Sequence, residues 1–189
     1  SSFVSAVAIR LRPVLVIVGV IWAVEIVNLF TGHSLVALGI QPRSVSGLIG
    51  VPLAPLIHGG LWHAVSNTLP LIILGGLTLV GGKERFWEVT LGIVAVSGVL
   101  VWLLARDAQH VGASGIVFGY FGAIVARAFF ERRLISIAIA FLTVFIYGSL
   151  IWGVLPQRSY ISFESHLFGL LAGVFIVWLS NKIRRDSKS

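Results

Sequence analysis

Six long apolar segments alternate with short polar segments along the chain. Each apolar segment is close to the ~20 residues that a helix needs to cross the hydrocarbon core of a bilayer. The pattern therefore predicts an all-α integral membrane protein with six transmembrane helices in a single domain over residues 1–189. We place the helices at residues 13–30, 62–80, 86–104, 114–131, 134–152 and 164–181.

The segment between the first two helices, residues 31–57, is apolar but is interrupted by seven glycines and prolines. It cannot cross the membrane as one helix, because non-helical backbone in the bilayer core must be buried against protein. We therefore predict a long, ordered interfacial loop here. Pro13 suits the first turn of the first helix. Glu25 lies within that helix, and we expect its carboxylate to form a buried hydrogen bond to a neighbouring helix or loop.

Composition supports a membrane protein and excludes several other classes. Hydrophobic residues make up 57% of the 189 residues, charged residues only 11%, and the mean hydropathy is +1.00. A soluble domain cannot bury that much apolar surface. The absence of cysteine excludes disulfides and thiolate chemistry. The net charge of +7 lies in small clusters at the ends of the apolar segments, which indicates membrane topology and no nucleic-acid partner.

The basic residues predict which way the helices run. Three arginines, Arg43, Arg106 and Arg158, fall on one side of the predicted membrane, and Arg127 lies inside the fourth helix. The other ten basic residues share the opposite side, so the positive-inside rule places both termini in the cytoplasm. We expect a bacterial plasma membrane. The ten are Arg10, Arg12, Lys83, Arg85, Arg132, Arg133, Lys182, Arg184, Arg185 and Lys188.

Three polar residues on the second, fourth and sixth helices share one predicted depth. These helices all run inward, and Asn67, Ser114 and His166 each lie 18 residues before a cytoplasmic arginine. A rise of 1.5 Å per residue places all three roughly 27 Å above the basic clusters. His63 lies one turn above Asn67 on the same helical face. The four residues therefore meet in the outer part of the bilayer.

This set suits acyl-transfer chemistry. Glycines on both sides of Ser114 can expose its hydroxyl, and a neutral His166 is a suitable general base. Rows of small residues on the fourth and sixth helices allow close approach, so we expect a hydrogen bond between Ser114 and His166. No Asp or Glu lies at the level of Ser114 and His166 to orient the imidazole. Glu164 is only two residues from His166, but it is on the wrong helical face, so a dyad is favoured over a triad. Oxyanion donors would be His63, Asn67 and the Ser114 backbone N–H.

Each residue also has a simpler explanation. Gly-Ala-Ser-Gly segments serve as packing surfaces in membrane helices, and an asparagine can bridge two helices. His58 and His63 are five residues apart, which is not the spacing that chelates a metal on one helical face. A channel or metal transporter using His58, His63 and His166 would leave Ser114 unexplained. From the residues alone, acyl-transfer chemistry and these alternatives stay open.

The chain resembles the rhomboid intramembrane serine proteases over nearly its whole length. The motifs that carry the resemblance are His58-x4-His63-x3-Asn67, Gly112-Ala113-Ser114-Gly115, and Ser165-His166-Leu167-Phe168-Gly169-x3-Gly173, and Leu38 to Arg43 with Gly47-Leu48 resemble the family's first loop.

The resemblance implies a six-helix rhomboid-like bundle that needs no cofactor and no metal. It implies a Ser114–His166 dyad, oxyanion donors His63, Asn67 and the Ser114 N–H, and supporting residues His58, Gly112, Phe118 and Gly169. Its substrates would be single-pass transmembrane proteins within the lipid bilayer, cut at small residues in or near the membrane. The fifth helix and the loop that follows it would form a lateral gate.

Two features depart from the family's pattern. Phe118 replaces a tyrosine that in many relatives stacks on the catalytic histidine, and the ring that stacks is retained. A Trp-Arg pair common in the first loop is missing, which leaves open how this loop is anchored. The alternative to a protease is a catalytically inactive rhomboid-like protein that binds transmembrane helices.

Overall fold

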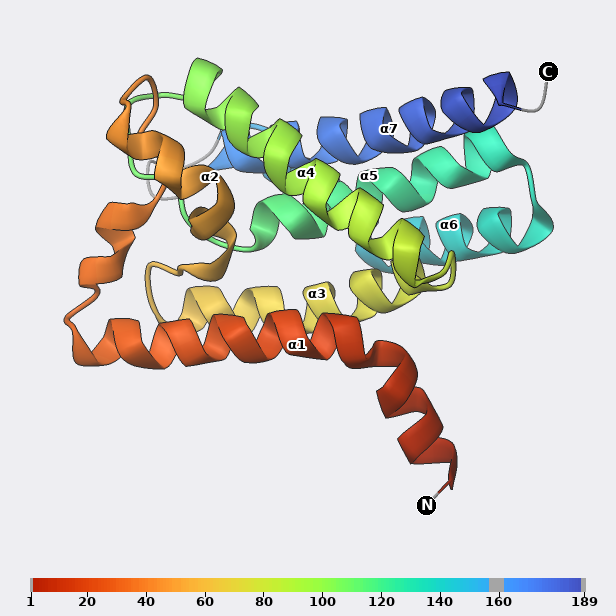
Figure 1. The fold of residues 1–189 in the computed structure, drawn as a ribbon, viewed down its shortest axis with the longest axis horizontal. Helices are drawn as coiled ribbons and strands as arrows, with labels where there is room; N and C mark the ends of the chain where they lie inside the picture. Colours follow the sequence, from red (N-terminus) through yellow and green to blue (C-terminus); the bar gives the residue numbers. More distant parts are fainter. Residues whose placement is uncertain (1, 157–161, 188–189) are drawn as a thin grey trace.

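The computed structural model of the chain describes residues 2–156 and 162–187 and is built from helices (Figure 1). Within these described residues six helices are long and apolar enough to cross a membrane, as predicted, so the chain is a multi-pass integral membrane protein. Arg158 and Lys188, which we used to assign topology, lie outside the described residues. The six are α1 (Ser2–Phe30), α3 (Leu61–Leu79), α4 (Lys83–Leu104), α5 (Ser114–Glu131), α6 (Leu134–Tyr147) with the 3-10 turns of η4 (Gly148–Val154), and α7 (Phe163–Asp186).

The first helix begins earlier than the sequence predicted. Pro13 lies inside α1 and not in its first turn, and Figure 1 shows the helix bending near its N-terminal end. A proline inside a helix removes one backbone hydrogen bond and kinks the helix, but apolar residues on both sides let it continue. The part that is apolar enough to span the membrane is Val7–Phe30.

The first loop is ordered and contains four short helices: η1 (Ser34–Leu38), η2 (Ser46–Ile49), α2 (Gly50–Leu53) and η3 (Ala54–Leu56). Its anchors lie at the C-terminal end of α4. The Arg43 guanidinium donates to the Ala105 carbonyl at 2.7 Å, and the Trp102 indole donates to the Ser44 carbonyl at 2.7 Å. A different arginine and tryptophan thus fasten a loop that lacks the family's Trp-Arg pair.

α5 is the centre of the bundle. In its apolar stretch 61% of the residues are buried, against 17% for the span that contains α6. Its glycines face those of α7: a Cβ atom on Gly169 would collide with the Gly115 backbone, and one on Gly173 with the Gly119 carbonyl. The small-residue rows predicted from the sequence therefore bring the backbones of these two helices into contact.

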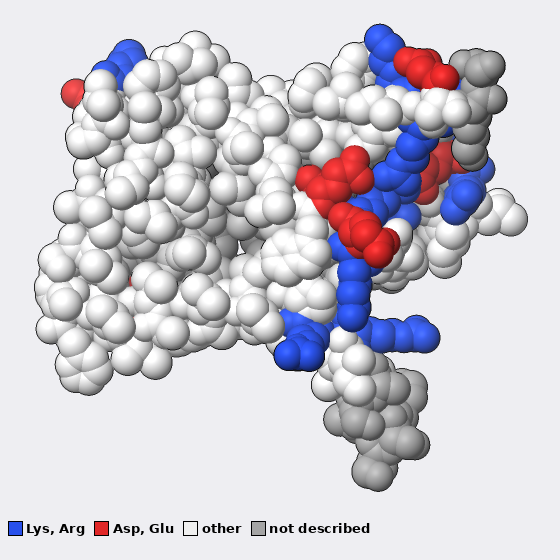
Figure 2. Space-filling view, in the orientation of Figure 1, with Lys and Arg blue, Asp and Glu red and all other residues white. Residues whose placement is uncertain are grey.

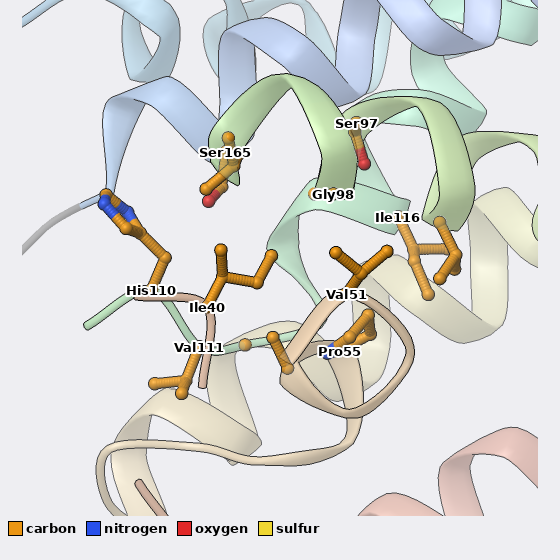
Figure 3. A pocket seen from close by; sticks show the side chains of 14 residues that line it. Ile40, Val51, Pro55, Ser97, Gly98, His110, Val111, Ile116 and Ser165 are labelled. Atoms are coloured by element: carbon orange, nitrogen blue, oxygen red, sulfur yellow. The ribbon is translucent and has the colours of Figure 1, made fainter. Parts of the chain in front are cut away.

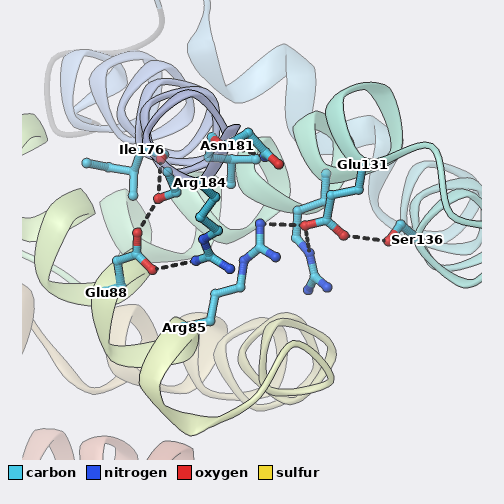
Figure 4. A network of polar contacts seen from close by, with 10 residues as sticks. Arg85, Glu88, Glu131, Ser136, Ile176, Asn181 and Arg184 are labelled. Atoms are coloured by element: carbon cyan, nitrogen blue, oxygen red, sulfur yellow. Dashed lines mark hydrogen bonds and ion pairs between the residues drawn. The ribbon is translucent and has the colours of Figure 1, made fainter. Parts of the chain in front are cut away.

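Charged side chains gather at one end of the molecule, where α4 begins and α5 and α7 end (Figures 1 and 2). The Glu131 side chain, only 7% exposed, lies there between Arg85 and Arg127 and accepts from the Ser136 hydroxyl at 3.0 Å (Figure 4). Glu88 pairs with Arg184 at 3.0 Å in a more exposed position. Between this charged end and a small charged group at the other end, the face shown in Figure 2 is nearly uncharged, as expected of a surface that contacts lipid.

The expectation for Glu25 is wrong. Its side chain is fully buried, but neither carboxyl oxygen has a hydrogen-bond partner among the described residues. Asn28, one turn later on the same face of α1, makes the polar contacts instead. Its amide nitrogen donates to the His58 carbonyl at 2.9 Å, and its oxygen accepts from the Leu35 N–H at 3.1 Å. Asn28 thus links α1 to the first loop and to the segment that precedes α3.

Candidate active site

A cavity of about 700 Å³ lies at the end of the bundle opposite the charged cluster, and it is lined by the residues that the sequence singled out. Ser114, the first residue of α5, lines it together with His166 from the first turns of α7. His63 and Asn67 line it from α3. The three helices therefore bring the predicted set into one cavity, to which Phe118 also contributes.

Backbone N–H groups and a glycine with positive φ hold the loop before Ser114 in place. Gly112 has a positive φ of 115°, which favours glycine, and a Cβ atom there would lie 2.6 Å from Cε1 of His63. The Gly112 N–H donates to the Ala54 carbonyl at 2.9 Å, and the Ala113 N–H donates to Nε2 of His58 at 3.2 Å. The loop that presents the serine is thus fastened to the first loop and to the segment before α3.

His58 supports this loop as a neutral ring. It is fully buried, and burial lowers its pKa to about 4. Its Nε2 accepts from Ala113, so the proton is on Nδ1, which has no partner among the described residues. Across residues 2–156 and 162–187 no three His, Asp or Glu side chains are placed to hold a metal ion.

His166 is oriented by a backbone carbonyl. Its Nδ1 lies 2.8 Å from the Gly153 oxygen in η4. A carbonyl can only accept, so Nδ1 carries the proton, and Nε2 of the neutral ring is left with a free lone pair. The ring also stacks on Phe118, with centroids 4.2 Å apart and planes within 6°. Two contacts therefore fix the tautomer and the plane of the candidate base.

The expected hydrogen bond between Ser114 and His166 is absent from the described residues, although both side chains line the same cavity. This corrects the prediction drawn from the small-residue rows. The rows determine how closely α5 and α7 approach, whereas the serine rotamer and the tilt of the imidazole decide whether the two polar atoms meet. Catalytic hydrogen bonds are often long before substrate binds, so the gap leaves the chemistry possible.

The oxyanion donors that we predicted have defined orientations. The Gly59 N–H donates to Nδ1 of His63 at 3.4 Å, so the proton of the neutral His63 ring is on Nε2, the edge that faces Gly112. The Asn67 amide donates one N–H to the His63 carbonyl at 2.9 Å and retains a second. With the Ser114 backbone N–H at the start of α5, three donors border the same cavity.

A second, much smaller cavity lies behind the serine loop (Figure 3). Its volume of about 30 Å³ is enough for a water molecule. Ser97 and Gly98 on α4, Val51 in the first loop and Ser165 on α7 line it, together with His110. It adjoins the serine loop through Gly112 and neighbours the main cavity, because His110 and Val111 line both cavities.

Sequence reasoning missed two groups at the site. Gly153 contributes only a carbonyl oxygen, which no side-chain pattern can reveal. His110 was not among the residues that the sequence singled out, but it is 1% exposed and its Nδ1 lies 2.6 Å from the Ser162 hydroxyl. The available signal was its position, since His110 precedes Ser114 by four residues, as Ser162 precedes His166.

Comparison with known proteins identifies the fold. The Rhomboid domain family matches residues 43–182. An uncharacterized protein of Mycobacterium tuberculosis is 32% identical over 185 residues, which cover 93% of this chain and 77% of that protein. "Putative rhomboid protease YdcA" of Bacillus subtilis is 30% identical over 131 residues (66% and 63% of the two chains), and RHOMBOID-like protein 4 of Arabidopsis thaliana is 28% identical over 128 residues (64% and 31%). The chain belongs to the rhomboid family.

Proposed function

We propose that this rhomboid protein is an intramembrane serine endopeptidase that uses Ser114 and His166 as its catalytic dyad. The observation that carries the proposal is the shared cavity, in which a serine hydroxyl, an imidazole with a free Nε2 and three N–H donors converge from three helices. A packing role for the Gly-Ala-Ser-Gly segment explains the glycines, but it does not explain the orientation of the two histidines.

The roles follow from the geometry. Nε2 of His166 takes the proton as the Ser114 oxygen attacks a peptide carbonyl, and the imidazolium that forms returns it to the leaving amine. The oxyanion is held by the Ser114 N–H, Nε2–H of His63 and the free Asn67 N–H. A water molecule, activated by the same histidine, then hydrolyses the acyl-enzyme. The Gly153 carbonyl stabilises the imidazolium, as a carboxylate does in a triad.

Location in the membrane defines the substrate class. The ten basic residues predict that the charged end of the bundle faces the cytoplasm, and in that orientation the cavity, which lies at the opposite end, belongs to the outer part of the bilayer. A substrate must reach Ser114 from the lipid or from the outer surface, so single-pass membrane proteins with small residues near the cut are the expected substrates. The least buried span, which contains α6, provides the Gly153 contact and is the element past which such a helix would enter.

The test uses the full chain in proteoliposomes with a transmembrane model substrate and a fluorophosphonate probe. The wild type should cleave the substrate and bind the probe, and Ser114→Ala should do neither while unfolding at the wild-type temperature. His166→Ala should lose cleavage. An active Ser114→Ala variant would overturn the assignment. A wild type that binds the substrate helix but never cleaves it would instead indicate an inactive, helix-binding rhomboid protein.

A further inference from the structure

A hydrogen bond joins the two segments that present the candidate dyad. His110 lies four residues before Ser114, Ser162 lies four residues before His166, and Nδ1 of His110 is 2.6 Å from Oγ of Ser162. We infer that His110 and Ser162 are a pair of positioning residues that set the distance between nucleophile and base. The inference rests on the proposed function and goes beyond it, because neither side chain needs to touch the substrate.

The direction of each hydrogen bond follows from the partners. Burial lowers the pKa of His110, so the ring is neutral at pH 7. Its Nε2 donates to the Arg106 carbonyl at 3.1 Å, which leaves Nδ1 as an acceptor. The Ser162 hydroxyl must therefore donate to Nδ1 of His110.

Ser162 also caps α7. Its oxygen accepts from the Ser165 N–H at 3.3 Å, and it lies 2.6 Å from the Ser165 hydroxyl. The Ser162 hydroxyl thus contacts two segments of the site. It caps the N-terminus of α7, and it binds the loop that precedes α5.

His110 is the fixed partner. Its backbone exchanges two hydrogen bonds of 3.0 Å with Ile40 in the first loop, which lies beside it in Figure 3. His110 itself is only 1% exposed. Two residues further along, the Gly112 N–H is bound to the Ala54 carbonyl. The first loop therefore fixes the segment from His110 to Ser114. The hydrogen bond from the Ser162 hydroxyl then holds the start of α7 at a fixed distance from that segment.

The spacing of the dyad needs this contact. The contact of Gly169 with Gly115 holds α5 and α7 together on the C-terminal side of Ser114 and His166. It does not fix the segments on the N-terminal side of the two residues. Glu164 also joins the same two segments, since its Oε1 lies 3.5 Å from Nε of Arg106 and accepts from the Arg106 N–H at 3.4 Å, but the arginine side chain is 34% exposed and these contacts are long. A displacement of ~1 Å at reacting groups costs about a hundredfold in rate.

The experiment separates positioning from capping. His110→Phe keeps the ring volume and leaves the Ser162 cap intact, but it removes the Nδ1 acceptor together with the Nε2–H bond to the Arg106 carbonyl. We expect it to lower kcat by about 10- to 100-fold with KM within about twofold, and to slow fluorophosphonate labelling of Ser114 by the same factor. Ser162→Ala should do likewise, Ser162→Thr should restore kcat relative to the alanine variant, and Ser46→Ala, on the exposed first loop, is the matched control.

The double variant gives the decisive comparison. If the two residues act through their mutual hydrogen bond, the loss of rate in His110→Phe with Ser162→Ala is clearly smaller than the product of the two single losses. Multiplied effects, or a His110→Phe enzyme with wild-type kcat and labelling rate, would overturn the inference while leaving the proposed function intact. A wild type that neither cleaves nor reacts with the probe would overturn both. Unfolding temperatures of all variants show whether a loss of rate merely reflects misfolding.

Discussion

The Gly153 carbonyl oxygen lies 2.8 Å from Nδ1 of His166, so a residue of η4 orients the imidazole of α7. This contact replaces the carboxylate of a triad by a neutral backbone group. It also makes the candidate base sensitive to the position of η4, which continues the least buried span of the bundle. Movement of that span to admit a substrate would release the histidine, and closure would restore its orientation.

Gly153→Ala should damage this arrangement. An added Cβ atom would lie 2.6 Å from Cζ of Phe118 and 3.2 Å from Nδ1 of His166, so the base must shift. We expect kcat on a transmembrane substrate to fall by about 10- to 100-fold, with a smaller change in KM. Gly148→Ala, in the same element, is the control because its nearest neighbour would be 3.7 Å away. Equal kcat values for the two variants would contradict the prediction.

Phe118→Leu tests the stacked ring. Leucine retains much of the apolar volume, but it cannot lie flat at 4.2 Å on the imidazole. An aromatic pair is worth about 0.5–1.5 kcal/mol beyond its buried area, which corresponds to a loss of roughly 2- to 12-fold in kcat if the energy is spent on orienting the base. The measurement is kcat beside the unfolding temperature, which should change little. A leucine variant as fast as the wild type would show that the ring is only packing.

Gly173→Ala should destabilise the bundle. The new methyl group would collide with the Gly119 carbonyl on α5, and overpacking of this kind costs about 1–3 kcal/mol. Gly19→Ala is the matched control within a spanning helix, because a Cβ atom there has no neighbour within 4 Å. Thermal unfolding in detergent should show a lower midpoint for Gly173→Ala only. If both variants unfold like the wild type, α5 and α7 are not in backbone contact.

Stability should depend on pH through His58. Burial lowers its pKa to about 4, whereas an exposed histidine titrates near 6.5. Between these values the unfolded chain binds the extra proton, so this contribution to stability is complete above pH 6.5 and is lost as the pH falls to 4, by about 3 kcal/mol in total. His58→Gln cannot titrate, and its unfolding free energy should fall less steeply over this range. Parallel curves for the two proteins would contradict this assignment.

The two acidic residues of the charged end should differ in importance. Glu131→Gln leaves Arg85 and Arg127 unpaired where their side chains are only 14% and 12% exposed, and removal of one partner from a buried ion pair costs about 3–5 kcal/mol. Glu88→Gln removes a pair whose side chains are 42% and 50% exposed, which is worth about 0–1 kcal/mol. Chemical unfolding in detergent compares them directly, and a larger loss for Glu88→Gln would refute the ranking.

Helix positions and side-chain chemistry were predictable because each depends on sequence spacing. The common level of Asn67, Ser114 and His166 required only a rise per residue and a topology, and the structure places all three at one cavity. The resemblance to the rhomboid family then narrowed the chemistry. The Gly169 and Gly173 contacts followed from small residues repeated every four positions.

The contacts that could not be predicted from the sequence depend on how segments far apart in the chain meet. The Gly153 oxygen has no side-chain signature, and the His110–Ser162 contact depends on how two loops meet. Glu25 was expected to have a partner because buried polar groups usually do, but in this structure Asn28 makes the contacts at that level. The start of α1 was misplaced because a proline can be accommodated within a long apolar helix as well as at its first turn.

The packing of α7 against α5 also has a consequence for how the protein is made. The ribosome completes Ser114 and the whole of α5 before it begins α7, and the small residues of α5 have no glycine-rich neighbour until α7 has been inserted beside them. His166 arrives with that same helix. Under the proposed mechanism, the newly made chain therefore carries the candidate nucleophile Ser114 without its candidate base until α7 has been inserted.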